Sequence, residues 1–486
     1  MILSHYRSGS GAVLVETREE SRLLKEILIE LPRTAQVYTV AAPQGVVRDV
    51  RKGKPADGGL QGLAVAYGWA QDGPGRVLLV YDWHMLVNNP GQWRQLIEAL
   101  PGLRSPKGAK GNDCASLVVF VGPAWDLQPC NPLRGAIPHL QFNPPDRDSL
   151  RGIAAGLAEL NGDGELVVDA LCGLSADSAE QAAAECLAAC GKWDADYLRN
   201  ARKQLIREAG LEIWPATAEL GGLSGFREFA ERELIPWVRD EQLAVNRVIC
   251  AGVPGVGKSY GARWLASQLR CECCRLSIPS LKAGIVGSSE ANLKRALRAL
   301  DALGADAPIV CVIDEIDTIA RDGLDGGTSS GMFAELLTWL QESKARCVVV
   351  ATLNRLDKLD AALESRFAAR FFFDLPTRQE RQAVAKIHYD RLRCEGSEKA
   401  ASATASLTDG FSSRELAEYI CPSVARRTSR KPSEEVIAEI CNSTTPASKT
   451  QVEQLEKMRH AASALRRAND PVQEHVPTGR KIGRKE

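Results

Sequence analysis

Short apolar runs alternate with longer segments whose apolar positions recur every three or four residues through the first 376 residues of the chain. Such runs predict buried strands, and the three-to-four spacing predicts amphipathic helices. Strands are predicted first at residues 12–17, 36–41, 76–82, 116–122 and 139–142, with helices at 18–31, 60–69 and 93–100. Because strands that alternate with helices build parallel sheets, residues 1–147 are predicted to form an α/β domain.

The pattern changes after residue 147 and then begins again. Residues 148–215 are predicted to be a helical subdomain and linker, with helices at 149–160, 178–190 and 194–209 and a linker over 211–223. In residues 216–376, strands return at 245–250, 309–313, 347–351 and 371–373, among helices at 226–237, 260–266, 289–303 and 332–342. Residues 377–445 are helical once more, at 377–393 and 412–420, and 446–486 are expected to hold a helix at 452–467 and a basic tail. An α/β module followed by helices thus occurs twice.

The composition sets limits without indicating a function. Hydrophobic residues make up 44% and charged residues 25% of the 486, as is usual for a folded protein. We find no apolar segment typical of a signal peptide and no apolar run long enough to span a membrane. The 14 cysteines lie among predicted strands and helices, which favours buried, reduced thiols in a cytoplasmic protein.

A phosphate-binding loop is predicted where the strand at 245–250 meets the next helix. The segment contains Gly252, Pro254, Gly255, Val256, Gly257, Lys258, Ser259 and Tyr260, and so matches the pattern GxxxxGK[ST]. Glycines allow successive backbone N–H groups to point inward, and the helix N-terminus adds positive potential. Lys258 is then expected to reach the β- and γ-phosphates, and the Ser259 hydroxyl to ligate Mg²⁺.

Two later strands end in side chains that suit a bound nucleotide. The strand at 309–313 is followed by Asp314, a predicted metal ligand, and by Glu315, predicted to activate the attacking water. The strand at 347–351 leads to Asn354, predicted to position that water. The carboxyl ends of parallel strands share one edge of the sheet, where ligands bind in open α/β folds.

The first module lacks this chemistry. No GK[ST] follows any of its strands, and the strand at 77–81 ends in Asp82, Trp83 and His84 rather than in two adjacent carboxylates. The isolated His84 and His139 are predicted to be packed or surface side chains. The cysteines at 271, 273 and 274 have no second ligand pair nearby in sequence, so a structural zinc is not predicted there.

These motifs together resemble an AAA ATPase. The resemblance rests on the loop at 252–259, the strand and carboxylates at 310–315, Asn354, and the segment 359–367. Within that group, the stretches at 286–297, 325–330, 337–342 and 372–377 are similar to conserved plastid and cyanobacterial hypothetical reading-frame AAA proteins, which also occur in bacteria. The resemblance implies two P-loop-type α/β modules, each followed by a small helical lid, of which the first is degenerate.

Further expectations follow from the resemblance alone. It implies Mg²⁺-dependent ATP hydrolysis in a hexameric ring, with Arg366 completing a neighbouring subunit's site in trans and Arg370 as the second candidate. Leu363 stands where related proteins often carry another arginine. Arg414 either contacts the γ-phosphate, as a sensor-2 residue does, or is an exposed arginine at a helix start. Ile285 occupies the pore position where protein-threading rings carry an aromatic residue, so threading is not a firm expectation.

Three classes of function remain open from the sequence. The first is an ATP-driven remodeller of a protein client that docks on residues 1–215, in the bacterial cytosol, a phage host cytosol or the plastid stroma. The second is a nucleic-acid-associated factor that uses the basic segment 421–486, whose net charge is about +5, although a solvated helix face and tail explain that charge more simply. The third is a nucleotide-switched scaffold with little turnover.

Overall fold

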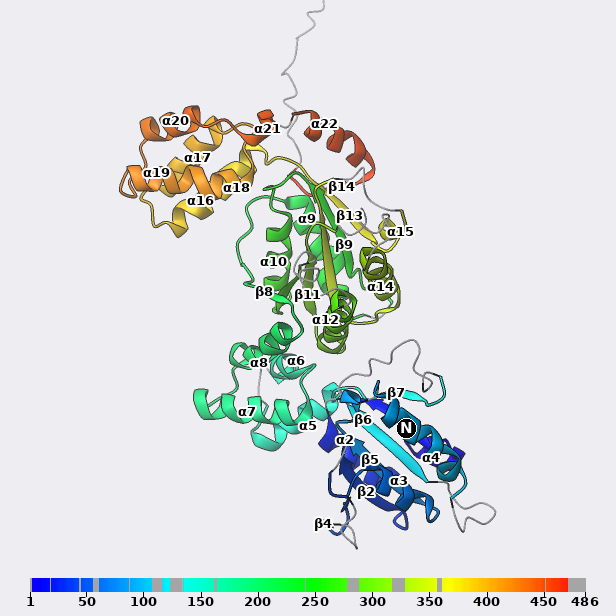
Figure 1. The fold of residues 1–486 in the computed structure, drawn as a ribbon. Coiled ribbons are helices and arrows are strands. Elements are labelled where there is room, and N and C mark those ends of the chain that lie inside the picture. Colours follow the sequence, from blue (N-terminus) through cyan, green and yellow to red (C-terminus); the bar gives the residue numbers. More distant parts are fainter. Residues whose placement is uncertain are drawn as a thin grey trace, which may run out of the picture. The chain divides into compact units, whose positions relative to one another are not determined.

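The structure is a computed structural model, and it forms two compact units (Figure 1). Unit 1 comprises residues 1–159 and 174–185, and unit 2 comprises residues 160–173 and 186–486. The structure describes residues 2–17, 19–42, 45–55, 61–86, 88–106, 116–122, 133, 135–160, 164–240, 242–277, 288–316, 328–355, 361–450 and 452–470. Ile285, the glycines of 325–327, the segment 356–360 and the terminal basic residues from 480 onwards lie outside these ranges.

Unit 1 is built on a seven-stranded sheet with the order β4-β3-β2-β5-β6-β1-β7. The strands are β1 (Ala12–Glu16), β2 (Gln36–Ala41), β3 (Arg48–Asp49), β4 (Lys54–Pro55), β5 (Arg76–Tyr81), β6 (Leu117–Gly122) and β7 (His139–Gln141). All pairs are parallel except those of β3 with β2 and with β4. Alternation along β1 sends Val13 and Val15 to one core and Leu14 to the other, which is why both faces of the sheet need helices.

Helices cover both faces of this sheet. The cluster that contains Val13 and Val15 also contains residues of α1 (Ile2–Ser8) and α2 (Glu20–Glu30). The opposite cluster is completed by α3 (Leu63–Gln71), the short η1 (Trp83–Met85) and α4 (Pro90–Arg104). The prediction of an α/β module in the first part of the chain is therefore confirmed.

Unit 2 contains a second seven-stranded sheet with the order β14-β13-β9-β12-β11-β10-β8. Its strands are β8 (Glu212–Trp214), β9 (Arg247–Gly252), β10 (Cys273–Leu276), β11 (Ile309–Ile313), β12 (Cys347–Leu353), β13 (Ala369–Phe373) and β14 (Arg466–Arg467). Of these strands, only β8 runs antiparallel to its neighbour, β10. One face is covered by α12 (Ser288–Gly304) and α14 (Thr328–Glu342). The other is covered by α9 (Ser224–Phe229), its continuation η2 (Ala230–Leu234) and η3 (Ile235–Trp237), and α10 (Lys258–Gln268).

The two sheets share one strand order. Numbered along the chain, the five mutually parallel strands of unit 1 (β1, β2, β5, β6, β7) lie in the order 2-3-4-1-5. The strands β9 to β13 of unit 2 lie in the order 5-1-4-3-2, which is the same order read from the opposite edge. The duplication of architecture predicted from the alternating pattern is thus present in the topology.

The helical lid of unit 2 follows β13. It consists of α16 (Arg378–Arg391), α17 (Ser397–Leu407), α18 (Ser413–Glu415), η5 (Leu416–Ile420), α19 (Cys421–Arg427) and α20 (Glu434–Ser443), around a core of its own. Capping boxes formed by Thr377 with Glu380, and by Ser412 with Glu415, start α16 and α18. The short α15 (Ala361–Glu364) precedes β13, and α21 (Ala447–Thr450) follows the lid.

Several predicted boundaries were wrong. The linker predicted over 211–223 contains β8, and the helix predicted over 452–467 is shorter, as α22 (Val452–Ala461) followed by η6 (Ala462–Ala464). The chain then forms β14, which pairs with β13 at the edge of the sheet. Strand β10, which contains Cys273 and Cys274, was not among the predicted strands.

The helices that lie between β7 and β8 in the sequence are divided between the two units. Helix α5 (Arg147–Leu157) belongs to unit 1, whereas α6 (Gly164–Leu171), which was not predicted, and α8 (Ala195–Glu208) belong to unit 2. Helix α7 (Ala176–Cys190) begins in unit 1, and its last residues are grouped with unit 2. None of the helices in the described ranges is both long and apolar enough to cross a membrane.

Candidate active site

The predicted phosphate loop joins β9 to α10 at the carboxyl edge of the second sheet. The strand ends at Gly252 and the helix begins at Lys258. Gly255 and Gly257 have φ angles of 86° and 99°, a region that side chains with a Cβ rarely enter. Pro254 and Val256 line the same cavity as these glycines. The backbone therefore forms a tight curl directly before a helix N-terminus, where an anion is favoured.

Lys258 is buried at the centre of this curl, with 7% of its surface exposed. Its Nζ donates to the carbonyl oxygens of Gly252 (2.5 Å) and Val253 (3.0 Å) and to Oδ1 of Asn354 (2.9 Å). A buried ammonium group needs such acceptors, because burial of an uncompensated charge is unfavourable. These three oxygens hold the charge at the point where a phosphate would lie.

The carboxylates after β11 lie beside the loop. Oδ1 of Asp314 accepts hydrogen bonds from Ser259 Oγ (3.3 Å) and Thr352 Oγ1 (2.8 Å). Glu315 follows with a left-handed φ of 51°, and its backbone N–H donates to Thr352 Oγ1 (3.0 Å). The two neighbouring carboxylates thereby occupy different positions, one beside the Ser259 hydroxyl and the other further along the sheet edge.

Asn354 links the two halves of the site. While its Oδ1 accepts from Lys258, its Nδ2 donates to Oε1 of Glu315 at 3.1 Å. The amide thus connects the phosphate-loop lysine to the carboxylate that was predicted to activate water. The structure brings together Lys258, Ser259, Asp314, Glu315 and Asn354 as the sequence predicted.

Arg275 is a further member of the site that the sequence pattern did not reveal. It lies on β10, and its Nη2 is 3.2 Å from Oδ2 of Asp314. The signal that could have indicated it is an arginine within an otherwise apolar strand, at Cys273–Leu276. A partly buried cation on a strand is stabilised by a carboxylate nearby.

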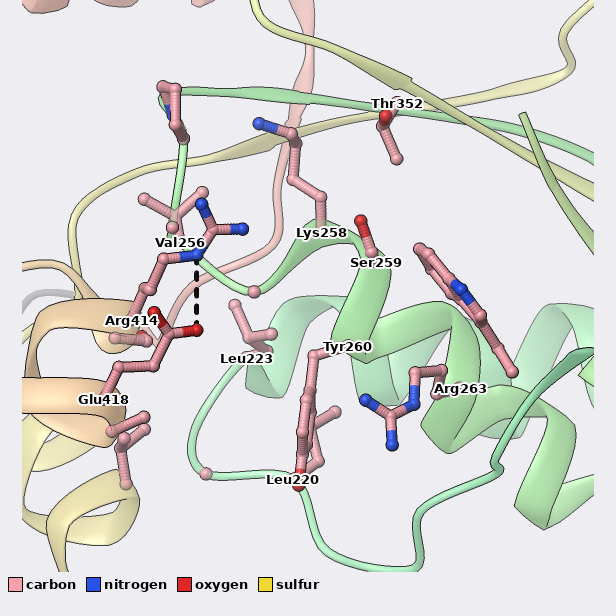
Figure 2. A pocket seen from close by; sticks show the side chains of 18 of the residues that line it. Leu220, Leu223, Val256, Lys258, Ser259, Tyr260, Arg263, Thr352, Arg414 and Glu418 are labelled. Atoms are coloured by element: carbon pink, nitrogen blue, oxygen red, sulfur yellow. Dashed lines mark ion pairs between the residues drawn. The ribbon is translucent and has the colours of Figure 1, made fainter. Parts of the chain in front are cut away.

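These residues line a cavity of about 730 Å³ that continues toward the lid (Figure 2). Beyond the polar end, its wall is formed by Leu220, Leu223, Val384 and Ile387, and by His388 of α16. Burial lowers the pKa of His388 below its ordinary value of 6.5, and the like charge of Arg391 lowers it further. The cavity therefore has a cationic, hydroxyl-bearing end and a mostly apolar end, and it is large enough for a nucleotide.

Tyr260 marks the side of the cavity nearest the linker. Its hydroxyl lies 3.1 Å from Thr217 Oγ1 and accepts from Arg391 Nη2 at 2.7 Å. The guanidinium of Arg263 lies 5.3 Å from the centre of the ring. Arg391 also pairs with Glu219. The residue after Ser259 thus connects the loop helix to the lid and to the segment that follows β8.

Arg414, at the start of the lid helix α18, lies against the phosphate loop. Its backbone N–H donates to the carbonyl oxygen of Gly255 at 2.9 Å, and its side chain is among those lining the cavity. The guanidinium is 62% exposed and lies 3.8 Å from Glu418, as the dashed line in Figure 2 shows. The structure therefore places this arginine at the site without directing its side chain to Lys258.

The predicted trans arginines lie away from this cavity. Arg366 donates through Nη1 to Ser365 Oγ and through Nη2 to Oε1 of Gln341 at 2.7 Å. Arg370, on β13, forms an ion pair with Glu364. Neither lines the cavity, so within one chain neither acts on its own site.

The corresponding edge of unit 1 has the opposite charge. Only residues 17–19 separate β1 from α2, and the buried Glu19 precedes the helix. Burial raises the pKa of Glu19, whose Oε1 accepts from the N–H of Ala176 at 2.8 Å. Asp82, after β5, has a left-handed φ of 62°, like that of Glu315 after β11. Glu19, paired with Arg22 at 3.0 Å, thus stands where unit 2 has its loop and lysine, whereas Asp82 is the counterpart of the carboxylates after β11.

Comparisons with known proteins agree with this description. Residues 248–375 match the profile of the ATPase family associated with various cellular activities (AAA). The chain is 30% identical over 285 residues to the uncharacterized AAA domain-containing protein ycf46 of Pyropia yezoensis, covering 55% of this chain and 57% of that protein. It is 27% identical over 340 residues to ycf46 of Guillardia theta, covering 65% and 64%. The matches therefore span less than two thirds of either relative.

More distant similarities cover smaller shares of the chain or have lower identity. The human ATPase family gene 2 protein homolog B is 31% identical over 150 residues, which is 30% of this chain and 20% of that protein. Among solved structures, the FIGL-1 AAA domain in complex with ADP has a TM-score of 0.45 and 20% identity, covering 54% of this chain and 97% of its own. The predicted resemblance to AAA proteins, and to the plastid ycf46 group among them, is confirmed by the sequence matches.

Proposed function

We propose that this chain, which carries an AAA domain in residues 248–375, hydrolyses ATP to ADP and phosphate at the cavity of unit 2. The observation that carries the proposal is the network of Lys258, Asn354 and Glu315. It joins a buried ammonium to a carboxylate through one amide. Phosphoryl transfer depends chiefly on positioning and on stabilisation of charge, which such a preorganised network supplies.

The polar end of the cavity would hold the phosphates. Lys258 would exchange its loop carbonyls for phosphate oxygens, and the N–H groups at the start of α10 point to the same place. The Ser259 hydroxyl and Asp314, 3.3 Å apart, supply the hard oxygen ligands that Mg²⁺ prefers. When bound there, Mg²⁺ would neutralise charge on the β- and γ-phosphates.

The remaining residues have roles that follow from their positions. Leu220, Leu223 and Val384 offer an apolar wall to the adenine ring. Glu315 would accept a proton from water, and Asn354 would orient that water. Arg414 is placed to contact the γ-phosphate if its side chain leaves Glu418.

The proposal is tested by separating nucleotide binding from turnover in the full chain. Glu315→Gln should keep ATP binding and lower phosphate release by about 10²-fold or more, because the general base is lost. Lys258→Ala should lose both ATP binding and phosphate release. Glu439→Gln, on the exposed face of the lid helix α20, is the control and should retain both. Unchanged phosphate release by Glu315→Gln would refute the assigned chemistry and favour a nucleotide-switched scaffold.

We also propose that subunits assemble into a hexameric ring that remodels a protein client docked on residues 1–215. The support is that Arg366 lies outside its own chain's cavity, which leaves it available to a neighbour's. The carboxylate-lined edge of unit 1 suits docking rather than catalysis. Mixing inactive Arg366→Ala and Lys258→Ala subunits should then restore part of the phosphate release, because some interfaces regain both an intact loop and an arginine. No recovery at any mixing ratio would count against a shared site.

A further inference from the structure

Arg275 lies between two carboxylates that come from different strands. On one side its Nη2 is 3.2 Å from Asp314 Oδ2, and on the other its Nη1 is 3.3 Å from Glu212 Oε2. The guanidinium also lies 5.3 Å from the centre of the Trp214 ring. Its side chain is 31% exposed, and those of Asp314 and Glu212 are 20% and 48% exposed. A single cation is therefore shared between the proposed metal ligand and the edge strand β8.

The sheet register produces this arrangement. In the antiparallel pairing of β10 with β8, Arg275 lies opposite Glu212. In the parallel pairing of β10 with β11, Arg275 lies opposite Val312, two residues before Asp314. The side chain can thus reach along β11 to the carboxyl edge while it remains beside β8. An arginine at the neighbouring register position would point to the opposite face of the sheet.

Arg275 competes with a metal ion for Asp314. The Oδ1 atom of Asp314 accepts from Ser259 and Thr352, while its Oδ2 pairs with Arg275. A cation bound by Asp314 would lie within a few ångströms of the guanidinium and be repelled by it. Metal binding at this carboxylate is therefore favoured when Arg275 moves toward its other partners, Glu212 and Trp214.

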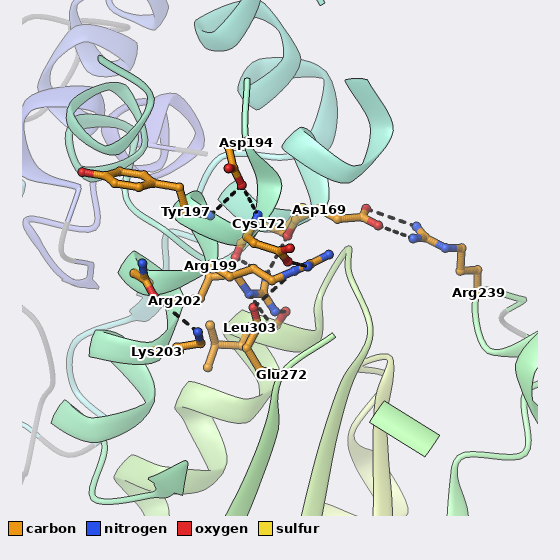
Figure 3. Close-up of polar contacts among 12 residues, drawn as sticks. Asp169, Cys172, Asp194, Tyr197, Arg199, Arg202, Lys203, Arg239, Glu272 and Leu303 are labelled. Carbon is orange, nitrogen blue, oxygen red and sulfur yellow. Dashed lines mark hydrogen bonds and ion pairs between the residues drawn. The ribbon is translucent and has the colours of Figure 1, made fainter. Parts of the chain in front are cut away.

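Strand β8, which supplies Glu212 and Trp214, is anchored to the sheet through the helix that precedes it. Helix α8 leads directly into β8, and its Arg202 is 1% exposed (Figure 3). Arg202 donates to Glu272 Oε2 at 3.0 Å, one residue before β10 begins, and to the carbonyl oxygen of Leu303 at 3.0 Å. Glu212 and Trp214 are thus presented to Arg275 by a strand whose preceding helix is anchored to the same sheet.

We propose that Arg275 is a positioning residue that sets the metal affinity of the site, and that Glu212 and Trp214 on β8 tune it. When Arg275 pairs with Asp314, the carboxylate is neutralised and magnesium binds less readily. When Arg275 leaves Asp314 and keeps only Glu212, Asp314 is free to ligate the ion. The edge strand β8 thereby acts on the nucleotide site through one guanidinium. The inference rests on the proposed binding of a magnesium nucleotide.

The test measures how strongly Mg²⁺ increases ADP affinity in the full chain, by calorimetric titration with magnesium and with EDTA. Because a direct contact of Arg275 with phosphate would change ADP affinity in both conditions, it cancels in the ratio of the affinity with magnesium to that with EDTA. Arg275→Gln should raise this ratio by about twofold to fivefold, the range that a partly exposed ion pair sets. Glu212→Gln should lower the ratio by a similar factor, because Arg275 then has only one carboxylate partner.

The distinguishing result is that the affinity ratio rises in Arg275→Gln and falls in Glu212→Gln. The exposed Arg427–Glu439 pair on the lid, 2.8 Å apart, supplies matched controls, Arg427→Gln and Glu439→Gln, which should leave the ratio unchanged. If Arg275→Gln does not fold, Glu212→Gln alone decides, since it alters an exposed edge strand. An unchanged ratio in Glu212→Gln, or a lower ratio in Arg275→Gln, would overturn the inference. If the wild-type chain does not bind ADP at all, the proposed function is refuted instead.

Discussion

At the scale of single residues, the site is organised by polar groups that are partnered by other groups of the chain. Lys258 is held by two carbonyl oxygens and Asn354, and Asp314 is held by two hydroxyls and Arg275. Preorganisation of this kind lowers the reorganisation needed when charge develops. Each side chain must nevertheless exchange a partner when ligand binds, so substitutions of the partners should change affinity as well as rate.

His388 gives a prediction about pH. Burial, followed by the like charge of Arg391, lowers its pKa in the folded protein below 6.5. The unfolded chain therefore takes up the proton first as the pH falls, so the residue leaves stability unchanged above pH 6.5 and reduces it as the pH drops toward the folded pKa. Thermal unfolding at about pH 7.5 and about pH 5.5 should show a smaller acid-induced loss in His388→Gln than in wild type. An identical loss in His388→Gln, with exposed His460→Gln as control, would contradict this assignment.

At the scale of secondary-structure elements, the helices α6 and α8, which lie between β7 and β8 in the sequence, belong to unit 2. Arg202 on α8 donates to Glu272 and to carbonyl oxygens at Asp169, Cys172 and Leu303 (Figure 3). It thereby joins α6, α8, β10 and α12 at one point. A buried guanidinium with this many acceptors defines where the helices dock.

Loss of this anchor should be strongly destabilising. Arg202→Met should lower the free energy of unfolding of unit 2 by about 3–5 kcal/mol, because the buried Glu272 loses its 3.0 Å partner and keeps only Arg199, 4.0 Å away. Arg202→Met combined with Glu272→Gln should recover part of the loss. Denaturant unfolding of the full chain, followed through the transition that ADP stabilises, measures both. A change below about 1 kcal/mol in Arg202→Met would show that the anchor is dispensable.

The sequence allowed the long, periodic elements to be predicted, and it concealed the short ones. Central strands such as Cys347–Leu353 are continuous apolar runs with a distinct signal. Strand β8 has only three residues, of which Glu212 is exposed, and it is formed through its pairing with β10. Strand β14 consists of two exposed arginines that pair with β13, far away in sequence. Both strands form by pairing with residues far away in the sequence, so no local sequence pattern indicates them.

The same division applies to the site. The loop, the carboxylates and Asn354 follow from motifs at strand ends, so their residues were predicted individually. Arg275 and the apolar wall formed by Leu220, Val384 and His388 come from distant segments. They become neighbours only when the lid and the edge strand fold against the sheet. Their side chains carry no spacing that a sequence motif could express.

At the scale of the whole molecule, one strand order is used twice with different chemistry at the sheet edge. Unit 2 presents a glycine loop, Lys258 and the start of α10 after its first parallel strand, whereas unit 1 presents Glu19 at that place. A lysine within a glycine loop favours an anionic ligand, and a carboxylate at the same place does not. Over the residues that the structure describes, we therefore propose one nucleotide site, in unit 2.

Counting bound nucleotides tests this central claim most directly. Calorimetric titration of the full chain with a non-hydrolysable ATP analogue and Mg²⁺ should give one site per chain, and Lys258→Ala should abolish the binding because the phosphate-loop cation is lost. Two sites per chain, or binding that survives intact in Lys258→Ala, would contradict the assignment of nucleotide binding to unit 2 alone.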